Sequence, residues 1–156
     1  MQNRDEIPMV KRKSMKEDAC PVARSLDVIG DRWSLLIIRD AFDDRRRFSD
    51  FQRSLRIARN ILTDRLRMLV EEDILTVQPA SDGSAYQEYV LTPKGEQLFP
   101  LVVALRQWGE RHLFSPGEPH SQLLDRETGR PLQAMSPHSA QGRLLTAQDT
   151  FVQKLD

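Results

Sequence analysis

The sequence contains a single cysteine, no long apolar run and no excess of charge of either sign. One cysteine cannot form an internal disulfide framework, and this scarcity of thiols fits a reducing cytoplasm. No apolar run approaches the roughly 20 residues that a membrane-spanning helix needs. The charged first residues also lack the apolar core of a secretory signal. These absences predict a cytoplasmic protein with no membrane partner.

Sequence patterns for catalysis and metal binding are missing as well. The three histidines, His112, His120 and His138, do not have the spacing of metal ligands, and one cysteine cannot complete a zinc site. There is no glycine-rich phosphate loop, and the scattered serine, histidine and aspartate residues do not define a catalytic triad. We therefore expect no metal, no cofactor and no enzymatic activity.

The neutral net charge conceals an uneven distribution, although the chain has 23 basic and 23 acidic residues. Residues 43–67 contain eight arginines and four acidic residues, whereas residues 69–113 contain three basic and seven acidic residues. A basic segment inside a neutral protein indicates a localised contact with a polyanion. The alternative is a solvated surface that happens to carry arginines, and charge alone does not separate the two.

The basic segment overlaps an amphipathic helix, predicted over residues 59–72. At about 100° per residue, Leu62, Leu66, Leu69 and Val70 share one face of this helix. The opposite face presents an amide, a hydroxyl, a carboxylate and a guanidinium, which are groups that read base edges in a major groove. The predicted base contacts are Asn60, Thr63, Asp64 and Arg67.

Three helices are predicted before this one. Pro21 opens the first and Gly30 ends it. Asp31 can cap a second, strongly apolar helix by accepting backbone N–H groups, and Ser49 is a good N-cap for a short third helix. Phosphate contacts are expected from the flanking basic and hydroxyl side chains, through charge or a helix N-terminus. These are Arg46, Arg47, Ser49, Arg53, Arg59 and Arg65.

A hairpin and one more helix are predicted after the polar-faced helix. Two β-prone runs flank the turn sequence 81–84, and Tyr86 and Gln87 could touch DNA from this hairpin. Thr92 then caps a long helix that Pro100 should kink. This order predicts a mainly α fold with a small β wing, the winged helix-turn-helix.

The chain divides into three parts on this interpretation. Residues 1–17 form a flexible tail, residues 18–114 form the winged helix-turn-helix domain with its dimerisation helices, and residues 115–156 form a C-terminal extension. The extension is rich in proline, glycine and serine. A second, small hairpin around the turn at residues 127–129 is the structure we expect in it.

Several segments of the chain together resemble the HxlR-type winged-helix transcription regulators of bacteria and archaea. They are CPVARSLDVIGDRWSLLIIRDAF, RRFSDFQRSL, ILTDRLRMLVEEDIL, YVLTPKGEQL and LRQWG. The resemblance covers residues 20–108. It implies a homodimeric, sequence-specific regulator that binds an inverted-repeat operator in double-stranded DNA. It also implies that some members respond to electrophiles or oxidants through a cysteine that matches Cys20, which makes Cys20 a redox-sensing candidate. A small molecule or an electrophile is therefore the expected class of effector.

Three positions depart from the family pattern. Ala58 replaces a common serine N-cap, which removes about 1 kcal/mol of helix stabilisation. Asp73 replaces a usual glycine and tolerates the left-handed conformation better than most residues. The wing contains no lysine or arginine, and this favours the alternative function of a winged-helix protein-interaction module without DNA binding.

The first and last helices of the domain are the expected dimer interface. Trp33 and Trp108 belong to the core or to this interface rather than to a ligand cage. Cys20 is either a small packed thiol or a reactive one, because it lies at the positive end of the first helix dipole. The predicted interface residues are Val22, Leu26, Ile29, Leu101, Leu105 and Trp108.

Overall fold

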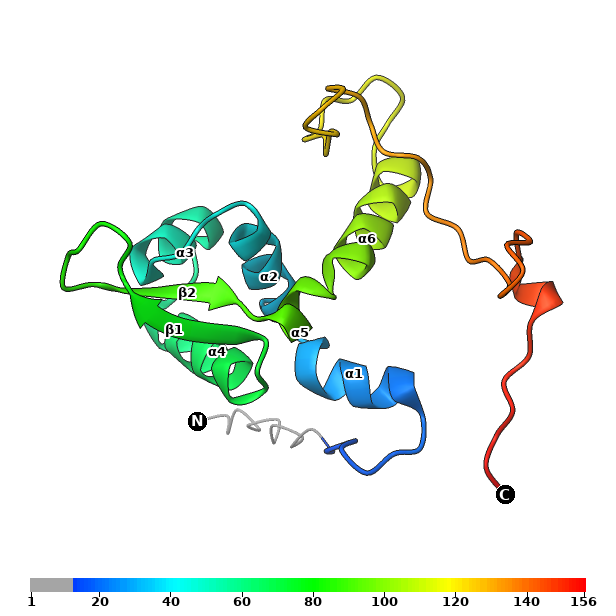
Figure 1. Ribbon diagram of the computed structural model, residues 1–156, viewed down its shortest axis with the longest axis horizontal. Helices are drawn as coiled ribbons and strands as arrows, with labels where there is room; N and C mark the ends of the chain where they lie inside the picture. Colours follow the sequence, from blue (N-terminus) through cyan, green and yellow to red (C-terminus); the bar gives the residue numbers. More distant parts are fainter. Residues whose placement is uncertain (1–12) are drawn as a thin grey trace, which may run out of the picture.

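The computed structural model describes residues 13–156, which form six α-helices, a two-stranded antiparallel sheet and a short 3-10 helix (Figure 1). The predicted fold, mainly α with a small β wing, is confirmed. No helix within the described residues is long and apolar enough to cross a membrane. In chain order the elements are α1 (Pro21–Ile29), α2 (Ser34–Phe42), α3 (Phe48–Leu55), α4 (Arg59–Glu71), β1 (Leu75–Pro79), β2 (Gln87–Leu91), α5 (Pro93–Glu96), α6 (Phe99–His112) and η1 (Ala147–Asp149).

The core lies between the helices α1 to α4 and the start of the sheet. Helix α4 contributes Leu62, Leu66 and Leu69, each at most 1% exposed, so the predicted apolar face of this helix is buried. Its polar face is left to solvent. The core residues are Ile29, Ile37, Ile38, Phe51, Ile57, Leu62, Leu66, Leu69, Ile74 and Leu75.

Three predicted helix boundaries are confirmed. Helix α1 begins at Pro21, and Gly30 follows its last residue. The Asp31 carboxylate accepts the backbone N–H groups of Trp33 and Ser34, both at 3.0 Å, and so satisfies donors at the start of α2. Asp73 has φ +58° just after α4, the left-handed conformation expected there.

The predicted start of the third helix is wrong. Helix α3 begins at Phe48, so Ser49 lies in its first turn instead of capping it. The Asp50 carboxylate accepts the N–H of Arg47 at 3.3 Å, which satisfies a donor ahead of the helix and moves its start toward the N-terminus.

The predicted long helix after the hairpin is also wrong, because the chain forms two helices, α5 and α6. Thr92 Oγ1 accepts the Gly95 N–H at 3.0 Å and caps α5, as expected for this threonine. The break falls at Gln97 and Leu98. Pro100 therefore lies in the first turn of α6, where its missing N–H costs nothing and no kink results.

The wing is the predicted hairpin, with strand pairs from Leu75–Leu91 to Pro79–Gln87. The Tyr89 N–H also donates to the carbonyl oxygen of Arg46 at 2.7 Å, which attaches β2 to the link between α2 and α3. In the extension, the expected second hairpin is reduced to one bridge between Leu124 and Pro131.

Candidate nucleic-acid interface

The outer face of α4 carries the polar side chains that the sequence predicts for base contacts. Asn60, Thr63, Asp64 and Arg67 are all exposed, on the side of the helix away from the core. The Thr63 hydroxyl donates to the carbonyl oxygen of Arg59 at 2.8 Å. The face therefore presents amide, hydroxyl and charged groups together to solvent.

Arg67 is held by two carboxylates of its own helix. Its guanidinium donates to Asp64 at 2.6 Å and to Glu71 at 2.8 Å. The hydrogen bond with Asp64, then that with Glu71, raises the pKa of Arg67 above its ordinary value. Exposed ion pairs of this kind contribute little free energy, so Arg67 can leave them for a base edge at small cost.

The N-terminus of α4 is uncapped, as the alanine at position 58 predicts. The side chain of Ala58 accepts no hydrogen bond, and Arg59 and Asn60 are exposed in the first turn. Free N–H groups at a helix N-terminus form a site for a phosphate oxygen. Arg59 lies close by, with its guanidinium 5.3 Å from the centre of the Phe48 ring.

Ser49 and Arg53 lie exposed on α3, on the same basic segment. Within residues 13–156, Arg53 makes no ion pair. Its charge is therefore available to an anionic partner.

Arg65 lies in a different setting from Arg53. Its guanidinium is 3.7 Å from the Asp31 carboxylate, and both side chains are largely buried. Burial of Asp31 opposes ionisation, but hydrogen bonds from Ser34 and Trp33, together with the charge of Arg65, outweigh it and lower the pKa of Asp31. Arg65 thus joins α4 to the start of α2 and lies off the exposed polar face.

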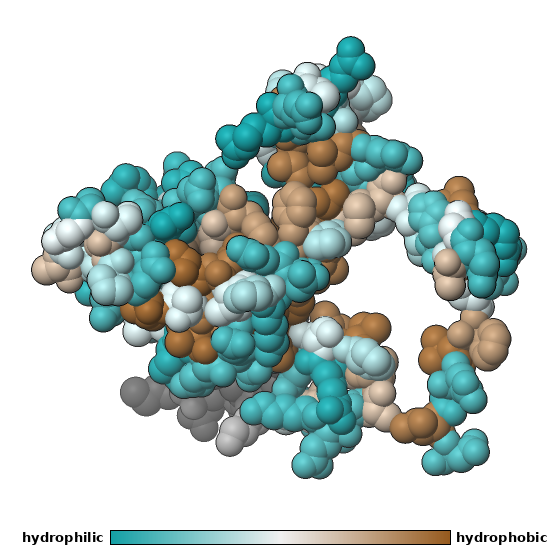
Figure 2. Space-filling model, in the orientation of Figure 1, coloured by the Kyte–Doolittle hydropathy of each residue, from teal (hydrophilic) through white to brown (hydrophobic). Residues whose placement is uncertain are grey.

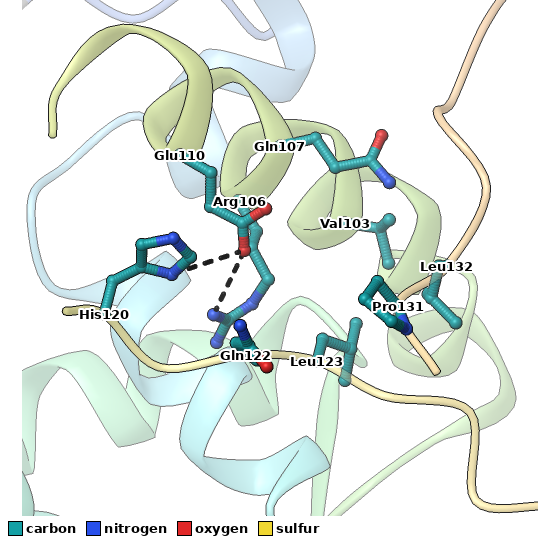
Figure 3. Close-up of a pocket in the computed structure, with 9 residues that line it drawn as sticks. All are labelled: Val103, Arg106, Gln107, Glu110, His120, Gln122, Leu123, Pro131 and Leu132. Carbon is teal, nitrogen blue, oxygen red and sulfur yellow. Dashed lines mark ion pairs between the residues drawn. The ribbon is translucent and has the colours of Figure 1, made fainter. Parts of the chain in front are cut away.

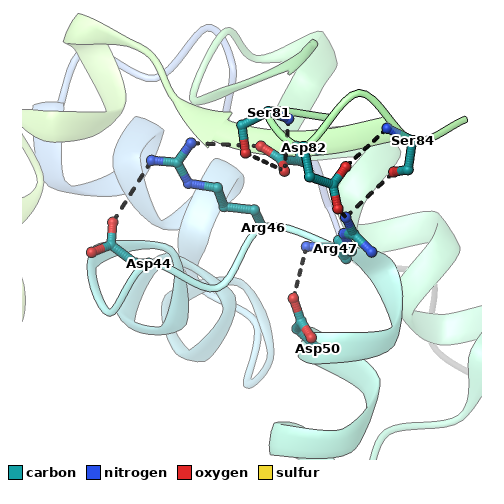
Figure 4. A network of polar contacts seen from close by, with 8 residues as sticks. Asp44, Arg46, Arg47, Asp50, Ser81, Asp82 and Ser84 are labelled. Carbon is teal, nitrogen blue, oxygen red and sulfur yellow. Dashed lines mark hydrogen bonds and ion pairs between the residues drawn. The ribbon is translucent and has the colours of Figure 1, made fainter. Parts of the chain in front are cut away.

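Arg46 and Arg47 both point to the wing (Figure 4). Arg46 is 3.5 Å from the Glu88 carboxylate, which is almost completely buried in β2 and also accepts two hydrogen bonds from Ser81. The Ser81 backbone hydrogen bond is the main reason that the pKa of Glu88 is lowered. Asp44 lies on the other side of Arg46, at 3.9 Å.

Arg47 pairs with Asp82 in the turn of the wing and stacks 5.1 Å from the centre of the Tyr86 ring. The Ser84 backbone N–H, the Ser84 hydroxyl and then Arg47 lower the pKa of Asp82 to about 2. Arg46 and Arg47, which were predicted to contact phosphates, therefore attach the wing to the helices in the structure. The sequence signal for these ion pairs is that the wing contains two acidic residues, Asp82 and Glu88, and no basic ones.

The remaining predicted residues lie on three other surfaces. Tyr86 and Gln87 are exposed on the wing, and Cys20 is exposed just before α1. Ile29, predicted at the dimer interface, is 5% exposed and lies in the core of its own chain. The other five predicted interface residues expose apolar surface on α1 and α6: Val22, Leu26, Leu101, Leu105 and Trp108. Among residues 13–156 no cluster of histidine, cysteine or acidic side chains could hold a metal ion.

Comparison with known proteins identifies the family. The HxlR-like helix-turn-helix family model matches residues 28–116. An uncharacterized HTH-type transcriptional regulator of Mycobacterium tuberculosis, Rv3095, is 43% identical over 108 residues, which cover 69% of this chain and 68% of that protein. The family-model match, residues 28–116, includes α2 to α6 and the wing. The region that resembles the family therefore contains the whole candidate interface.

Solved structures agree with this assignment. The crystal structure of PA1607, described as a candidate transcription factor, is 51% identical with a TM-score of 0.85 and covers 90% of this chain and 98% of that one. The reduced form of the redox regulator HypR is 33% identical with a TM-score of 0.56, over 60% of this chain and 94% of that one. The chain therefore belongs to the HxlR-like helix-turn-helix family of DNA-binding transcriptional regulators.

Proposed function

We propose that the protein is a homodimeric regulator that binds an inverted-repeat operator, with α4 of each subunit in the major groove of one half-site. The observation that carries this proposal is the exposed face of α4, with Asn60, Thr63, Asp64 and Arg67 opposite buried leucines. Two half-sites would then lie about one helical turn apart, or a multiple of it.

Contacts to the DNA backbone would come from α3 and the start of α4. Arg53 and Arg59 supply charge, Ser49 a hydroxyl, and the uncapped α4 N-terminus supplies free N–H groups. Tyr86 and Gln87 would approach the DNA from the wing. Phosphate contacts of this kind fix the register of the protein on the duplex.

The apolar surface on α1 and α6 supports the homodimer. Leu26 on α1 and Leu105 and Trp108 on α6 are about half exposed, and large exposed apolar side chains are typical of an interface. Light scattering that gave a monomer at micromolar concentration would contradict this part of the proposal.

The test is fluorescence anisotropy with the DNA upstream of the protein's own gene, repeated over a range of salt concentrations. Two arginines of the same basic segment provide a matched pair, because Arg53 has no ion pair among residues 13–156 and Arg65 is paired with Asp31. We expect Arg53→Ala to weaken specific and nonspecific binding alike and to reduce the salt slope by about 0.9. We expect Arg65→Ala to leave the slope unchanged. Equal slopes for the wild type and both variants would contradict the assigned interface.

A protein-interaction module is the second candidate function. The wing favours this function, because it contains no lysine or arginine that could contact a phosphate. Its two acidic residues, Asp82 and Glu88, are paired with Arg47 and Arg46. A wild-type protein that bound no DNA of any sequence at low salt would favour this function over the first.

We further propose that Cys20 couples an electrophile or redox signal to operator binding. The thiol is exposed and lies just before Pro21, at the N-terminus of α1, where a reagent in solution can reach it. HypR, a structural neighbour, is named a redox regulator. A competing role for Cys20 is packing at the dimer interface.

A further inference from the structure

The C-terminal extension consists of two parts that differ in their contacts, and the first is anchored on α6 (Figure 3). Arg106 donates to the backbone and side-chain oxygens of Ser121, both at 3.0 Å. Gln107 donates to the Gln133 carbonyl oxygen at 3.1 Å and accepts the Met135 N–H at 2.7 Å. The two hydrogen bonds of Gln107 hold residues 133–135 against α6 and set the direction in which the following residues leave the helix.

The second part, residues 136–156, is here called the arm. Within the described chain, every hydrogen bond that the arm makes stays inside it. It has local order, because His138 and Leu144 form a bridge and Asp149 accepts the Thr146 N–H at 2.8 Å at the start of η1. Figure 1 shows it running away from α6 and then back past the level of α1.

The end of the arm exposes large apolar side chains. Phe151 is 89% exposed, Val152 80% and Leu155 81%, and Leu144 is also exposed earlier in the arm. Burying one such side chain contributes roughly 1.5–3 kcal/mol, so leaving them in water is unfavourable. Soluble monomers rarely expose apolar residues gathered in this way, and a partner surface is the usual reason.

The exposed area of the whole chain leads to the same conclusion. A folded monomer of 18.0 kDa exposes about 8,000 Å², whereas this chain exposes 13,170 Å². Residues 1–12 can account for at most about 2,000 Å² of the difference. The remaining excess is about 3,000 Å² for one chain. Each subunit of an obligate homodimer buries about 1,000–2,500 Å², so the excess is large enough to supply such an interface.

The surface that the arm could cover is present on the same chain. Val22 and Leu26 on α1 and Leu105 and Trp108 on α6 expose apolar side chains. Figure 2 shows open space between the arm and the body of the molecule, with hydrophobic residues on both sides of it. The anchor on α6 directs the arm away from its own helices, so the apolar residues at its end are left uncovered by the same chain.

We propose that the occupant is the α1–α6 surface of a second copy of this chain, which the arm covers in return for the same contact from the partner's arm. Two-fold symmetry makes such an exchange reciprocal, since each copy carries both the arm and its apolar docking surface. The extension is thus an arm that stabilises the homodimer. This inference rests on the proposed homodimer but assigns it a contact beyond the two helices.

The likeness to PA1607 includes part of the extension. The winged-helix domain, residues 18–114, makes up less than two thirds of the chain, whereas the likeness to PA1607 covers 90% of it. The likeness therefore reaches into the extension. The likeness to HypR covers only 60% of the chain, so the arm is an addition to a domain that other regulators use without it.

The experiment compares full-length variants by analytical ultracentrifugation over nanomolar to micromolar concentrations. Phe151→Asp/Val152→Asp removes apolar side chains from the arm and adds two charges. Gln148→Asp/Gln153→Asp is the matched control, because it adds the same charges to the same arm and keeps its apolar residues. Neither pair belongs to the core, so circular dichroism should show unchanged folding.

We expect the first variant to raise the dimer dissociation constant at least about 100-fold and the control to leave it within about threefold of the wild type. If both variants formed dimers with the dissociation constant of the wild type, the arm contact would be overturned, while the homodimer itself would still stand. Equal weakening of both variants would also overturn it, since charge alone would then be the cause. A monomeric wild type at tens of micromolar would overturn the homodimer and the arm contact together.

Discussion

At the scale of single residues, Arg67 combines exposure with two nearby carboxylates. Asp64 and Glu71 hold the guanidinium over the outer face of α4 before any DNA arrives. These two ion pairs restrict the conformations of the Arg67 side chain in the free protein, so the side chain loses less conformational entropy when it binds DNA. An arginine prepared in this way is suited to the two acceptors of a guanine in the major groove.

We therefore expect Arg67→Ala to weaken operator binding roughly 5–150-fold and to relax specificity at one base pair of each half-site. Fluorescence anisotropy on the operator and on single-base variants measures both effects. Arg126→Ala, which removes a similar exposed charge from the C-terminal extension, is the control and should bind normally. If Arg67→Ala lost affinity equally for every sequence, Arg67 would be a phosphate contact instead.

Asp31 is the residue for which the structure predicts a dependence of stability on pH. Its pKa in the folded protein lies below the ordinary value of 3.8, so ionised Asp31 stabilises the fold above that value. As the pH falls through the folded-state pKa, the carboxylate is protonated and this contribution disappears. We expect Asp31→Asn to cost about 1 kcal/mol at pH 7 and progressively less as the pH falls below the ordinary value and through the folded-state pKa. Urea unfolding across this range tests it, and a constant difference would contradict it.

At the scale of elements, sequence reasoning succeeded where the determining signal is local. The period of Leu62, Leu66 and Leu69 and the turn sequence of the hairpin lie within a few residues, and both elements are as predicted. The errors at Ser49 and Pro100 are also local, and each came from a competing interaction: an earlier cap by Asp50 and a break ahead of α6.

Some of the arginines predicted to contact phosphates have ion-pair partners far away in the chain. Arg47 pairs with Asp82, 35 residues later, and Arg65 pairs with Asp31 on another helix. A basic residue in a basic segment looks available for phosphate until the tertiary fold supplies a carboxylate. Arg53 and Arg65 look alike in the sequence, and only packing distinguishes them.

The ion pair between Arg46 and the buried Glu88 is one of the contacts that attach the wing to the helices. Because Arg46→Ala leaves the buried Glu88 carboxylate without its cation, we expect it to lower the melting temperature by roughly 2–4 °C. Adding Glu88→Gln to this variant removes the unpaired charge and should restore most of the loss. Differential scanning calorimetry of the single and double variants measures this. No loss in Arg46→Ala, or no recovery in the double variant, would contradict the pairing.

At the scale of the whole molecule, the exposed arginines of the candidate interface and the apolar residues of the proposed dimer surface lie on different elements. Exposed Arg53, Arg59 and Arg67 lie on α3 and α4. The exposed apolar side chains assigned to the dimer surface lie on α1, α6 and the arm. A two-fold dimer through α1, α6 and the arm would leave both copies of α4 free for DNA. The distance between the two recognition helices would then depend on the packing of the subunits, as operator spacing requires.

Cys20 lies next to α1, on the proposed dimer surface, so chemical modification of its thiol could change the packing of the two subunits. It immediately precedes α1 and its thiol is exposed in the single chain. We expect addition of a quinone to the Cys20 thiolate to place bulk between the subunits, shift the recognition helices and change operator affinity about 5–150-fold, a coupling of 1–3 kcal/mol. Anisotropy during titration with the quinone, or with diamide as an oxidant, measures this, with Cys20→Ser as the control that should not respond. Identical responses of wild type and Cys20→Ser, or a thiol that stays unreactive in the folded protein, would make Cys20 a packing residue and require the signal to enter elsewhere.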